Sequence, residues 1–124
     1  MKLVKVERNS NYAWAAEKMR MELAVDDVDA QGANVATFQI AYPIAAFPDY
    51  AEYSRYGKYC QTPVTAVSDN SECAEQKLMA HFNAVKAKGA LVVWIFTERE
   101  PCGPEVHNCH QLLENAFGNG VTVY

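Results

Sequence analysis

The chain lacks a long hydrophobic run, since no stretch approaches the roughly 20 apolar residues that a membrane-spanning helix needs. Its start, Met1 to Leu3, lacks the hydrophobic region of a signal peptide. A basic excess is lacking as well, because 11 Lys and Arg stand against 15 Asp and Glu, for a net charge of −4. These absences predict a soluble, unprocessed protein without membrane contact. They also argue against nucleic-acid binding through a broad basic surface and leave room only for a narrow local contact.

Glycine and proline are scarce, at six and five residues, and they fall singly between periodic stretches. The chain has no repeats, low-complexity tracts or linkers. A length of 124 residues is enough for one hydrophobic core and too short for two. We therefore expect a single domain over residues 1–124.

Apolar periodicity predicts three helices, each with a polar residue at its expected start. Ser10 is expected to cap the first, and Asn108 the third. Asp69, with Glu72 three residues later, has the form of a capping box for the second. The expected helices cover residues 10–25, 69–88 and 108–117.

Four stretches have the composition of strands. The third, residues 91–96, is almost wholly apolar, as a strand covered on both faces would be. The expected strands cover residues 35–44, 64–67, 91–96 and 121–124. The order α-β-β-α-β-α-β predicts an α/β domain with a mixed sheet, whose last strands are joined by right-handed crossovers.

Two short motifs carry the candidate chemistry. Cys73-Ala74-Glu75 supplies a thiolate and a carboxylate, and Pro101-Cys102 followed by Cys109 supplies two more thiolates. The 25 residues between Glu75 and Pro101 fit one helix plus one strand, so both motifs can begin neighbouring helices. Three thiolates with an open fourth position suit a catalytic zinc site, at one ion per chain.

Spacing within each motif predicts where the ion lies. Cys73 and Glu75 are about 200° apart on an ideal helix, so both approach one ion only beyond the helix's N-terminal end. Thiolates that share a zinc ion lie less than about 4 Å apart, whereas seven residues of helix would separate Cys102 from Cys109 by about 10 Å. Residues 103–107 are therefore expected to loop out, with Cys109 in the first turn of the third helix.

Glu75 is expected to face the core, because it shares one helical stripe with Leu78, Phe82 and Val85. A carboxylate held there next to a metal can shuttle protons. The alternative is a first-turn Glu that merely favours the helix dipole.

The four cysteines leave other pairings open. They could form two disulfides, although their placement fits a reduced compartment and metal binding better. Cys102 and Cys109 could instead form a closed structural site with His107 and His110, or His107 could replace a cysteine ligand. His81 and Cys60 are expected to be structural.

At these motifs the chain resembles the cytidine deaminase superfamily, whose pattern is His or Cys, any residue, Glu, then Pro-Cys and a final Cys. The match covers residues 71–113 in detail. The resemblance implies a three-layer α/β/α fold, zinc held by Cys73, Cys102 and Cys109, and Glu75 as proton shuttle. It also implies hydrolytic conversion of cytosine to uracil.

The segment from Trp94 to Cys102 is similar to bacterial deaminase toxins, and the Cys-Ala-Glu motif resembles the toxin family that contains a single-stranded-DNA cytosine deaminase. This resemblance implies a delivered bacterial effector that acts on single-stranded DNA in the target-cell cytoplasm, with a cognate immunity protein. Six residues separate Cys102 from Cys109, more than is usual in the superfamily. A free-nucleoside deaminase is the alternative enzyme, and a noncatalytic zinc-stabilised binding module the alternative from another class.

Residues that would read the substrate are expected in loops around the pocket. A base held outside a duplex needs hydrogen bonds to its pairing edge and a stacking surface. The candidates are Asn34, Ser68, Asn70, Ser71, Trp94, Thr97, Arg99 and His107. The aromatic and basic segment from Tyr50 to Tyr59 could stack on bases, but a hairpin between the first two strands would place it away from the zinc.

Overall fold

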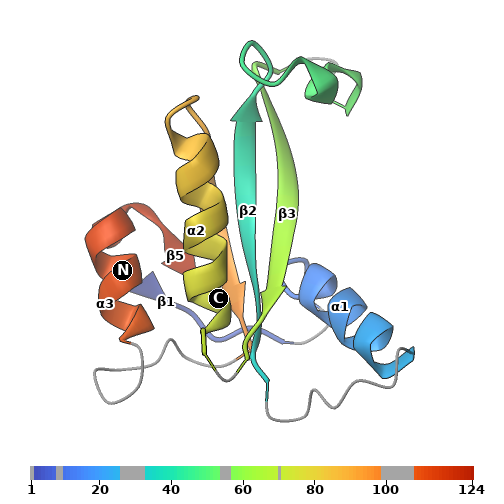
Figure 1. Ribbon diagram of the computed structural model, residues 1–124, viewed down its shortest axis with the longest axis vertical. Helices are drawn as coiled ribbons and strands as arrows, with labels where there is room; N and C mark the ends of the chain where they lie inside the picture. The colour runs from blue at the N-terminus through green and yellow to red at the C-terminus, as the bar shows by residue number, and fades with distance from the viewer. Residues whose placement is uncertain (1, 8–9, 26–32, 54–56, 70, 99–107) are drawn as a thin grey trace.

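A computed structural model of the chain has a five-stranded mixed sheet with the strand order β1-β5-β4-β2-β3 (Figure 1). The structure describes residues 2–7, 10–25, 33–53, 57–69, 71–98 and 108–124. The strands are β1 (Lys2–Leu3), β2 (Val35–Pro43), β3 (Tyr59–Val67), β4 (Leu91–Thr97) and β5 (Thr122–Val123). The helices are α1 (Trp14–Val25), α2 (Ala74–Lys86) and α3 (Cys109–Phe117), with the 3-10 turns η1 (Pro48–Tyr53) and η2 (Gly118–Gly120).

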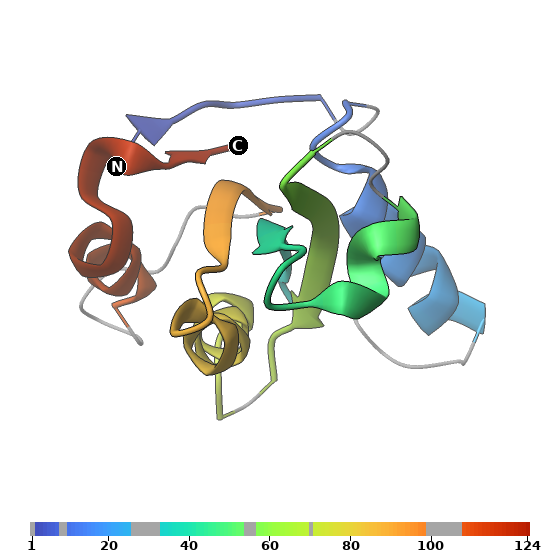
Figure 2. The same cartoon turned by 90° about the horizontal axis from the view of Figure 1, so that it is seen from above.

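The helices lie on both sides of the sheet, with α1 on one side and α2 and α3 on the other (Figure 2). Alternation along β2 explains this division. Phe38 and Ile40 belong to the larger core cluster, which also contains Leu78 of α2, whereas Val35 packs with Ala16 of α1. Burying a side chain such as Phe38 contributes about 1.5–3 kcal/mol to stability. The predicted α/β fold class is confirmed.

The predicted element order is confirmed, with one strand that the pattern did not predict. β1 is only two residues long and pairs in parallel with β5, near the other end of the chain. So short a strand leaves no alternation to detect. β4 and β5 are parallel and are joined through α3, the crossover connection that was expected. No helix in the described part of the chain is long and apolar enough to cross a membrane.

β2 and β3 form the expected antiparallel hairpin, in continuous register from Val35 opposite Val67 to Pro43 opposite Tyr59. β3 is longer than the predicted 64–67, because residues from Tyr59 onward also pair with β2 despite the interruption of the strand pattern by Pro63. The connection between the strands lies far from the start of α2, as predicted (Figure 1). Within it Tyr50 stacks on Tyr42, with ring centroids 4.8 Å apart, and packs against the core.

Two predicted helix starts are wrong. α2 begins at Ala74 rather than Asp69, because Asp69 Oδ1 accepts hydrogen bonds from the backbone N–H groups of Ser71 and Glu72, both at 2.8 Å, and forms a separate turn. α1 begins at Trp14, and Ser10 Oγ is buried without a hydrogen-bond partner among the described residues, so it does not cap the helix.

Both-sided burial of β4 holds for only part of the strand. Ile95, Phe96 and Thr97 are buried, but Leu91 is 54% and Val93 39% exposed. The pairing of β4 with β2 also shifts register between Gln39 and Ile40, which pair with Trp94 and Val92, so Val93 lies at an irregularity of the strand.

Candidate metal centre and active site

The N-terminal ends of α2 and α3 lie at the same end of the molecule (Figure 1). Cys73 is the extended N-cap residue of α2, and Cys109 is the first residue of α3. The two Sγ atoms and a carboxylate oxygen of Glu75 all lie within 4.8 Å of one another. These three residues therefore converge beyond the helix ends, as the spacing predicted.

Backbone conformation sets these helix starts. The Cys73 N–H donates to Gln76 Oε1 at 2.7 Å, which fixes the first turn of α2. Asn108 is the predicted N-cap of α3, but it takes a left-handed conformation with φ 52° and its side chain makes no capping bond. Asn tolerates this region better than most residues, so Asn108 contributes its backbone conformation directly before Cys109.

The donors suit zinc. Two thiolates within 4.8 Å of each other need only a small closure to share a zinc ion, whose bonds to sulfur are about 2.3 Å long. Cys109 is fully buried, and Cys73 is partly exposed. The positive ends of two helix dipoles also favour thiolates at this position. Cys102, the third expected ligand, and the expected loop at 103–107 lie outside the described residues.

Glu75 is 2% exposed and faces the core, as predicted. Its Oε1 accepts hydrogen bonds from Asn34 Nδ2 and from Thr97 Oγ1, both at 3.0 Å. Asn34 Nδ2 also donates to Thr97 Oγ1 at 2.9 Å. The three side chains thus form a closed triangle beside the thiolates.

Asn34 is itself held by the hairpin. Its backbone N–H donates to Ser68 Oγ at 2.7 Å, and its carbonyl accepts from the Ser68 N–H at 2.9 Å. Ser68 is therefore connected to Glu75 through Asn34. Among the described substrate candidates, Asn34 and Thr97 alone contact the carboxylate. Asn70, Arg99 and His107 lie outside the described residues.

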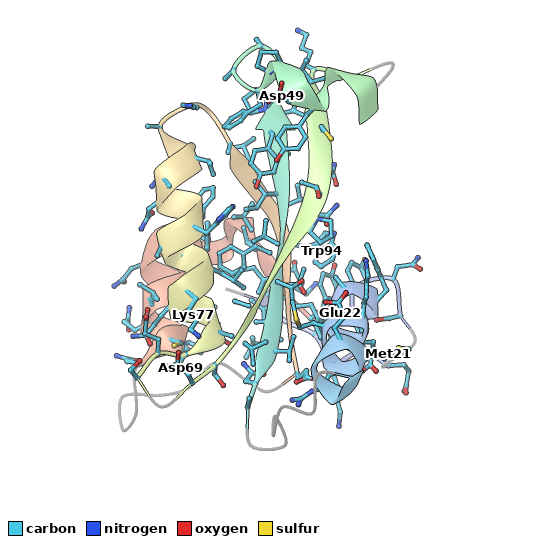
Figure 3. All side chains as sticks on the ribbon, turned by 45° about the vertical axis from the view of Figure 1, so that its right-hand side comes forward. Met21, Glu22, Asp49, Asp69, Lys77 and Trp94 are labelled. Atoms are coloured by element: carbon cyan, nitrogen blue, oxygen red, sulfur yellow. The ribbon has the colours of Figure 1, made fainter. Side chains whose placement is uncertain are left out.

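Two further candidates lie elsewhere. Ser71 is exposed and donates its hydroxyl to Asp69 at 2.9 Å, as part of the turn before α2. Trp94 lies on the side of the sheet that α1 covers, in edge contact with Tyr12 at 5.1 Å (Figure 3). Alternation along β4 places Trp94 and Thr97 on opposite faces. That position gives no support to a substrate contact for Trp94.

Among the described residues, His81, His110 and Cys60 do not belong to the thiolate and carboxylate cluster. His81 and His110 are exposed, and His81 lies 3.4 Å from the Tyr42 hydroxyl. Cys60 is buried in β3.

An ion pair between Arg20 and Glu98 lies next to the residues that contact Glu75. The sequence pattern did not predict this ion pair. Arg20 donates to Glu98 Oε1 at 2.6 Å and to Oε2 at 3.0 Å, and also to the Ala33 carbonyl at 2.5 Å. The hydrogen bond with Glu98 raises the pKa of Arg20 above its usual value, against the effect of burial. The only sequence feature that could have indicated a role for Glu98 was its position directly after Thr97.

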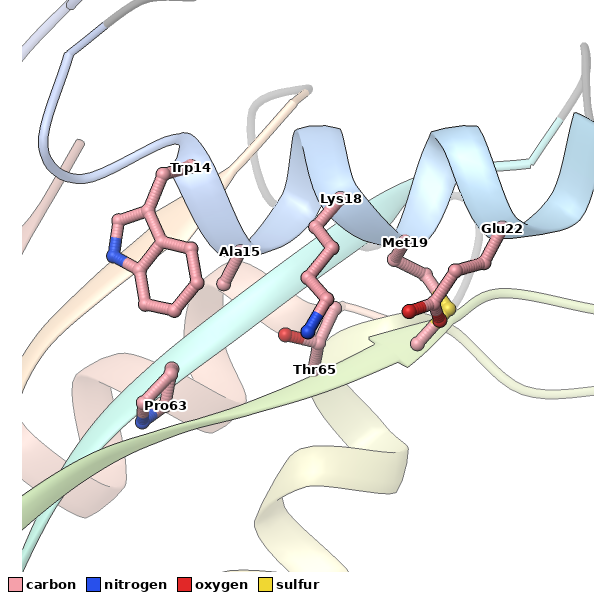
Figure 4. A pocket seen from close by; sticks show the side chains of 7 residues that line it. All are labelled: Trp14, Ala15, Lys18, Met19, Glu22, Pro63 and Thr65. Carbon is pink, nitrogen blue, oxygen red and sulfur yellow. The ribbon is translucent and has the colours of Figure 1, made fainter.

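A hollow of about 180 Å³ lies on the other side of the molecule, between α1 and β3 (Figure 4). Trp14, Lys18 and Pro63 are among the residues that line it. It shares no residue with the thiolate and carboxylate cluster. We attribute it to the packing of α1 on the hairpin.

Comparison with known proteins indicates a family whose reaction fits the thiolate and carboxylate donors of this site. A family model described as Xanthomonas-like deaminase matches residues 50–124, which is more than half of the chain and includes both motifs. No curated protein and no solved structure matches the chain significantly. The chain therefore belongs to the Xanthomonas-like deaminase family.

Proposed function

We propose that this protein is a zinc-dependent hydrolytic deaminase that converts cytosine to uracil in single-stranded DNA. The observation that carries the proposal is the convergence of Cys73, Glu75 and Cys109 within 4.8 Å at the starts of two helices. Family membership supports deamination as the reaction class. Cytosine and single-stranded DNA rest on the resemblance of the two motifs to deaminases of that specificity.

Cys73, Cys102 and Cys109 would hold one zinc ion per chain. When bound, zinc supplies Lewis acidity that makes water a better nucleophile near neutral pH. Three protein ligands leave a coordination position open, which distinguishes a catalytic site from a closed structural one.

Glu75 moves the protons of the reaction. The water oxygen forms a bond to C4 of cytosine, and Glu75 accepts a proton from that water. Glu75 gives this proton to ring nitrogen N3. It then takes the second proton from the hydroxyl group on C4 and gives it to the exocyclic nitrogen, so that C4=O forms, the C4–N bond breaks, and ammonia leaves. Burial of the carboxylate excludes bulk water, which would otherwise exchange with these protons.

We expect the protein to bind single-stranded DNA through a narrow local contact and not through a broad basic surface. A target base must leave any stack to reach a buried carboxylate, and a single strand lowers that cost. The net charge of −4 disfavours binding of duplex DNA through a broad electrostatic contact with its phosphates. Asn34 and Thr97 flank Glu75 through hydrogen bonds to its carboxylate, so the base would have to enter a confined position beside these side chains.

We further propose that the domain is a bacterial toxin delivered into the cytoplasm of a target cell and neutralised by an immunity protein. The support is the similarity of the segment from Trp94 to Cys102 to bacterial deaminase toxins. Expression in a bacterial host tests this directly. Wild-type protein should raise the frequency of C-to-T mutations, and a Glu75→Ala variant should not.

The substrate is tested by incubating the zinc-loaded protein with cytosine-containing single-stranded DNA, duplex DNA, RNA and free cytidine. Glu75→Ala should be inactive, and the exposed neighbour Glu72→Ala serves as the matched control. Uracil in single-stranded DNA alone would support the proposal. Uracil from free cytidine alone would identify a nucleoside deaminase, and a zinc-loaded protein inactive on every substrate would indicate a binding module.

A further inference from the structure

We propose that Asn34 and Thr97 are positioning residues that hold one oxygen of the Glu75 carboxylate and so orient the other oxygen toward the reacting base. This inference rests on the proposed deaminase function. It assigns to the two residues a task separate from any contact with substrate.

The hydrogen bonds are directed at a single atom. Asn34 Nδ2 and Thr97 Oγ1 both reach Glu75 Oε1 at 3.0 Å. Rotation about the last bond of a Glu side chain is otherwise weakly restricted. Two donors on Oε1 fix that rotation and with it the direction of Oε2.

The protons of the triangle can be assigned consistently. The Asn34 amide has two protons, one for Glu75 Oε1 and one for Thr97 Oγ1 at 2.9 Å. The single hydroxyl proton of Thr97 is then directed to Glu75, because its alternative acceptor, Asn34 Oδ1, is more distant at 3.3 Å. Two of the three donated protons therefore reach Glu75 Oε1, and the third, from Asn34 to Thr97, holds the second donor in place.

Both donors belong to the sheet and not to α2. Asn34 directly precedes β2, and Thr97 ends β4, two antiparallel strands joined here by a bond from the Glu98 N–H to the Val35 carbonyl at 3.1 Å. Thr97 is 8% and Glu75 2% exposed, so water competes weakly for these hydrogen bonds. The sheet therefore sets the direction of a side chain that the helix supplies.

Kinetics of Thr97 variants test the positioning role. Thr97→Val keeps the shape of the side chain and removes the hydroxyl, so kcat should fall by about 10- to 100-fold with little change in KM, within the loss that a misplaced catalytic group produces. Thr97→Ser keeps the hydroxyl and should recover most of the activity. Thr65→Val is the matched control, because it likewise removes a threonine hydroxyl with a side-chain contact, here to the Thr37 hydroxyl at 3.2 Å, away from the site.

A second measurement needs no activity. The side-chain amide protons of Asn34 report their hydrogen bonds in a ¹⁵N–¹H NMR spectrum of the folded chain. Glu75→Ala should move one of these two resonances upfield, and Thr97→Val should move them as well. Thr65→Val should leave them unchanged.

The outcomes separate this inference from the proposed function. Asn34 resonances that do not respond to Glu75→Ala would overturn the positioning role, whatever the activity. A Thr97→Val variant with raised KM and normal kcat would also overturn it, since Thr97 would then act on substrate binding. If the wild-type protein deaminates nothing while the resonances respond as expected, the proposed function fails and the fixed carboxylate remains.

Discussion

The guanidinium of Arg20 holds the carboxylate of Glu98 at two points, 2.6 Å from Oε1 and 3.0 Å from Oε2. Oε1 of Glu98 also accepts the backbone N–H of Val35 at 3.0 Å. This contact ties α1 to the ends of the two strands that present Asn34 and Thr97 to Glu75. A helix on the far side of the sheet thereby contributes to the geometry of the site.

Replacing Arg20 tests this link. Arg20→Gln should lower the free energy of unfolding by about 1–2 kcal/mol, between the values for exposed ion pairs and for buried charged hydrogen bonds. Arg20→Lys should recover only part of that loss, because a single ammonium group cannot reproduce the two-point contact. Urea denaturation measures both effects, with the exposed Lys18→Gln as the control on the same helix. Equal stability of wild type and Arg20→Gln would contradict the prediction.

Two buried cysteines provide a test of the metal site. Cys109→Ser should abolish stoichiometric zinc, because Cys109 supplies one of the thiolates that converge on the site. Cys60→Ser changes another buried cysteine, in β3, and should retain one zinc ion per chain. Elemental analysis of the purified protein, together with its concentration, gives the number of zinc ions per chain. Cys102→Ser should behave like Cys109→Ser, and full zinc content in that variant would refute the expected ligand set.

Asp69 should contribute stability in a pH-dependent manner. The ion pair with Lys77 at 2.7 Å, followed by the N–H groups of Glu72 and Ser71, holds the pKa of Asp69 well below its ordinary value of 3.8 (Figure 3). Because the folded-state pKa is the lower one, this stabilisation is present above pH 4 and is lost on acidification through the folded-state pKa.

Asp69→Asn therefore should be less stable than wild type at pH 7, and the difference should shrink steadily below pH 4. Urea unfolding at a series of pH values measures it. Lys77→Gln provides the reciprocal test, because it removes the largest cause of the lowered pKa. A difference between wild type and Asp69→Asn that stayed constant down to pH 2 would show that the carboxylate's ionisation is not involved.

The Cys73 and Glu75 part of the ligand cluster was predictable from sequence because its geometry is local. Cys73 and Glu75 are two residues apart, so helix geometry alone places their shared ion beyond the helix end. Asn108 next to Cys109 similarly predicted the start of α3, although the Asn acts through its backbone conformation and not through a side-chain cap.

Pairings between distant segments were not predictable in the same way. Arg20 and Glu98 are 78 positions apart, and neither lies in a motif. The face on which Trp94 lies depends on the register of β4, which a continuous apolar run does not specify. The start of α2 was misplaced because Asp69 makes the same hydrogen bonds in a turn that it would make in a capping box.

Leu113 connects the stability of the fold to the metal site. It lies four residues after Cys109 on α3, is fully buried, and belongs to the larger core cluster. Leu113→Ala should destabilise the protein by about 2–5 kcal/mol through lost burial and the resulting cavity. Leu112 is only partly buried, so Leu112→Ala on the same helix should cost less.

Zinc binding should stabilise wild type and Leu113→Ala alike, because the ion binds the folded chain preferentially and holds α3 by Cys109. Thermal unfolding with and without zinc measures this, and the Tm difference between wild type and Leu113→Ala should persist in both conditions while both Tm values rise. In a Cys109→Ser background zinc should no longer raise the Tm. An equal rise in that background would mean that zinc stabilises the fold through other residues and that α3 does not carry a ligand.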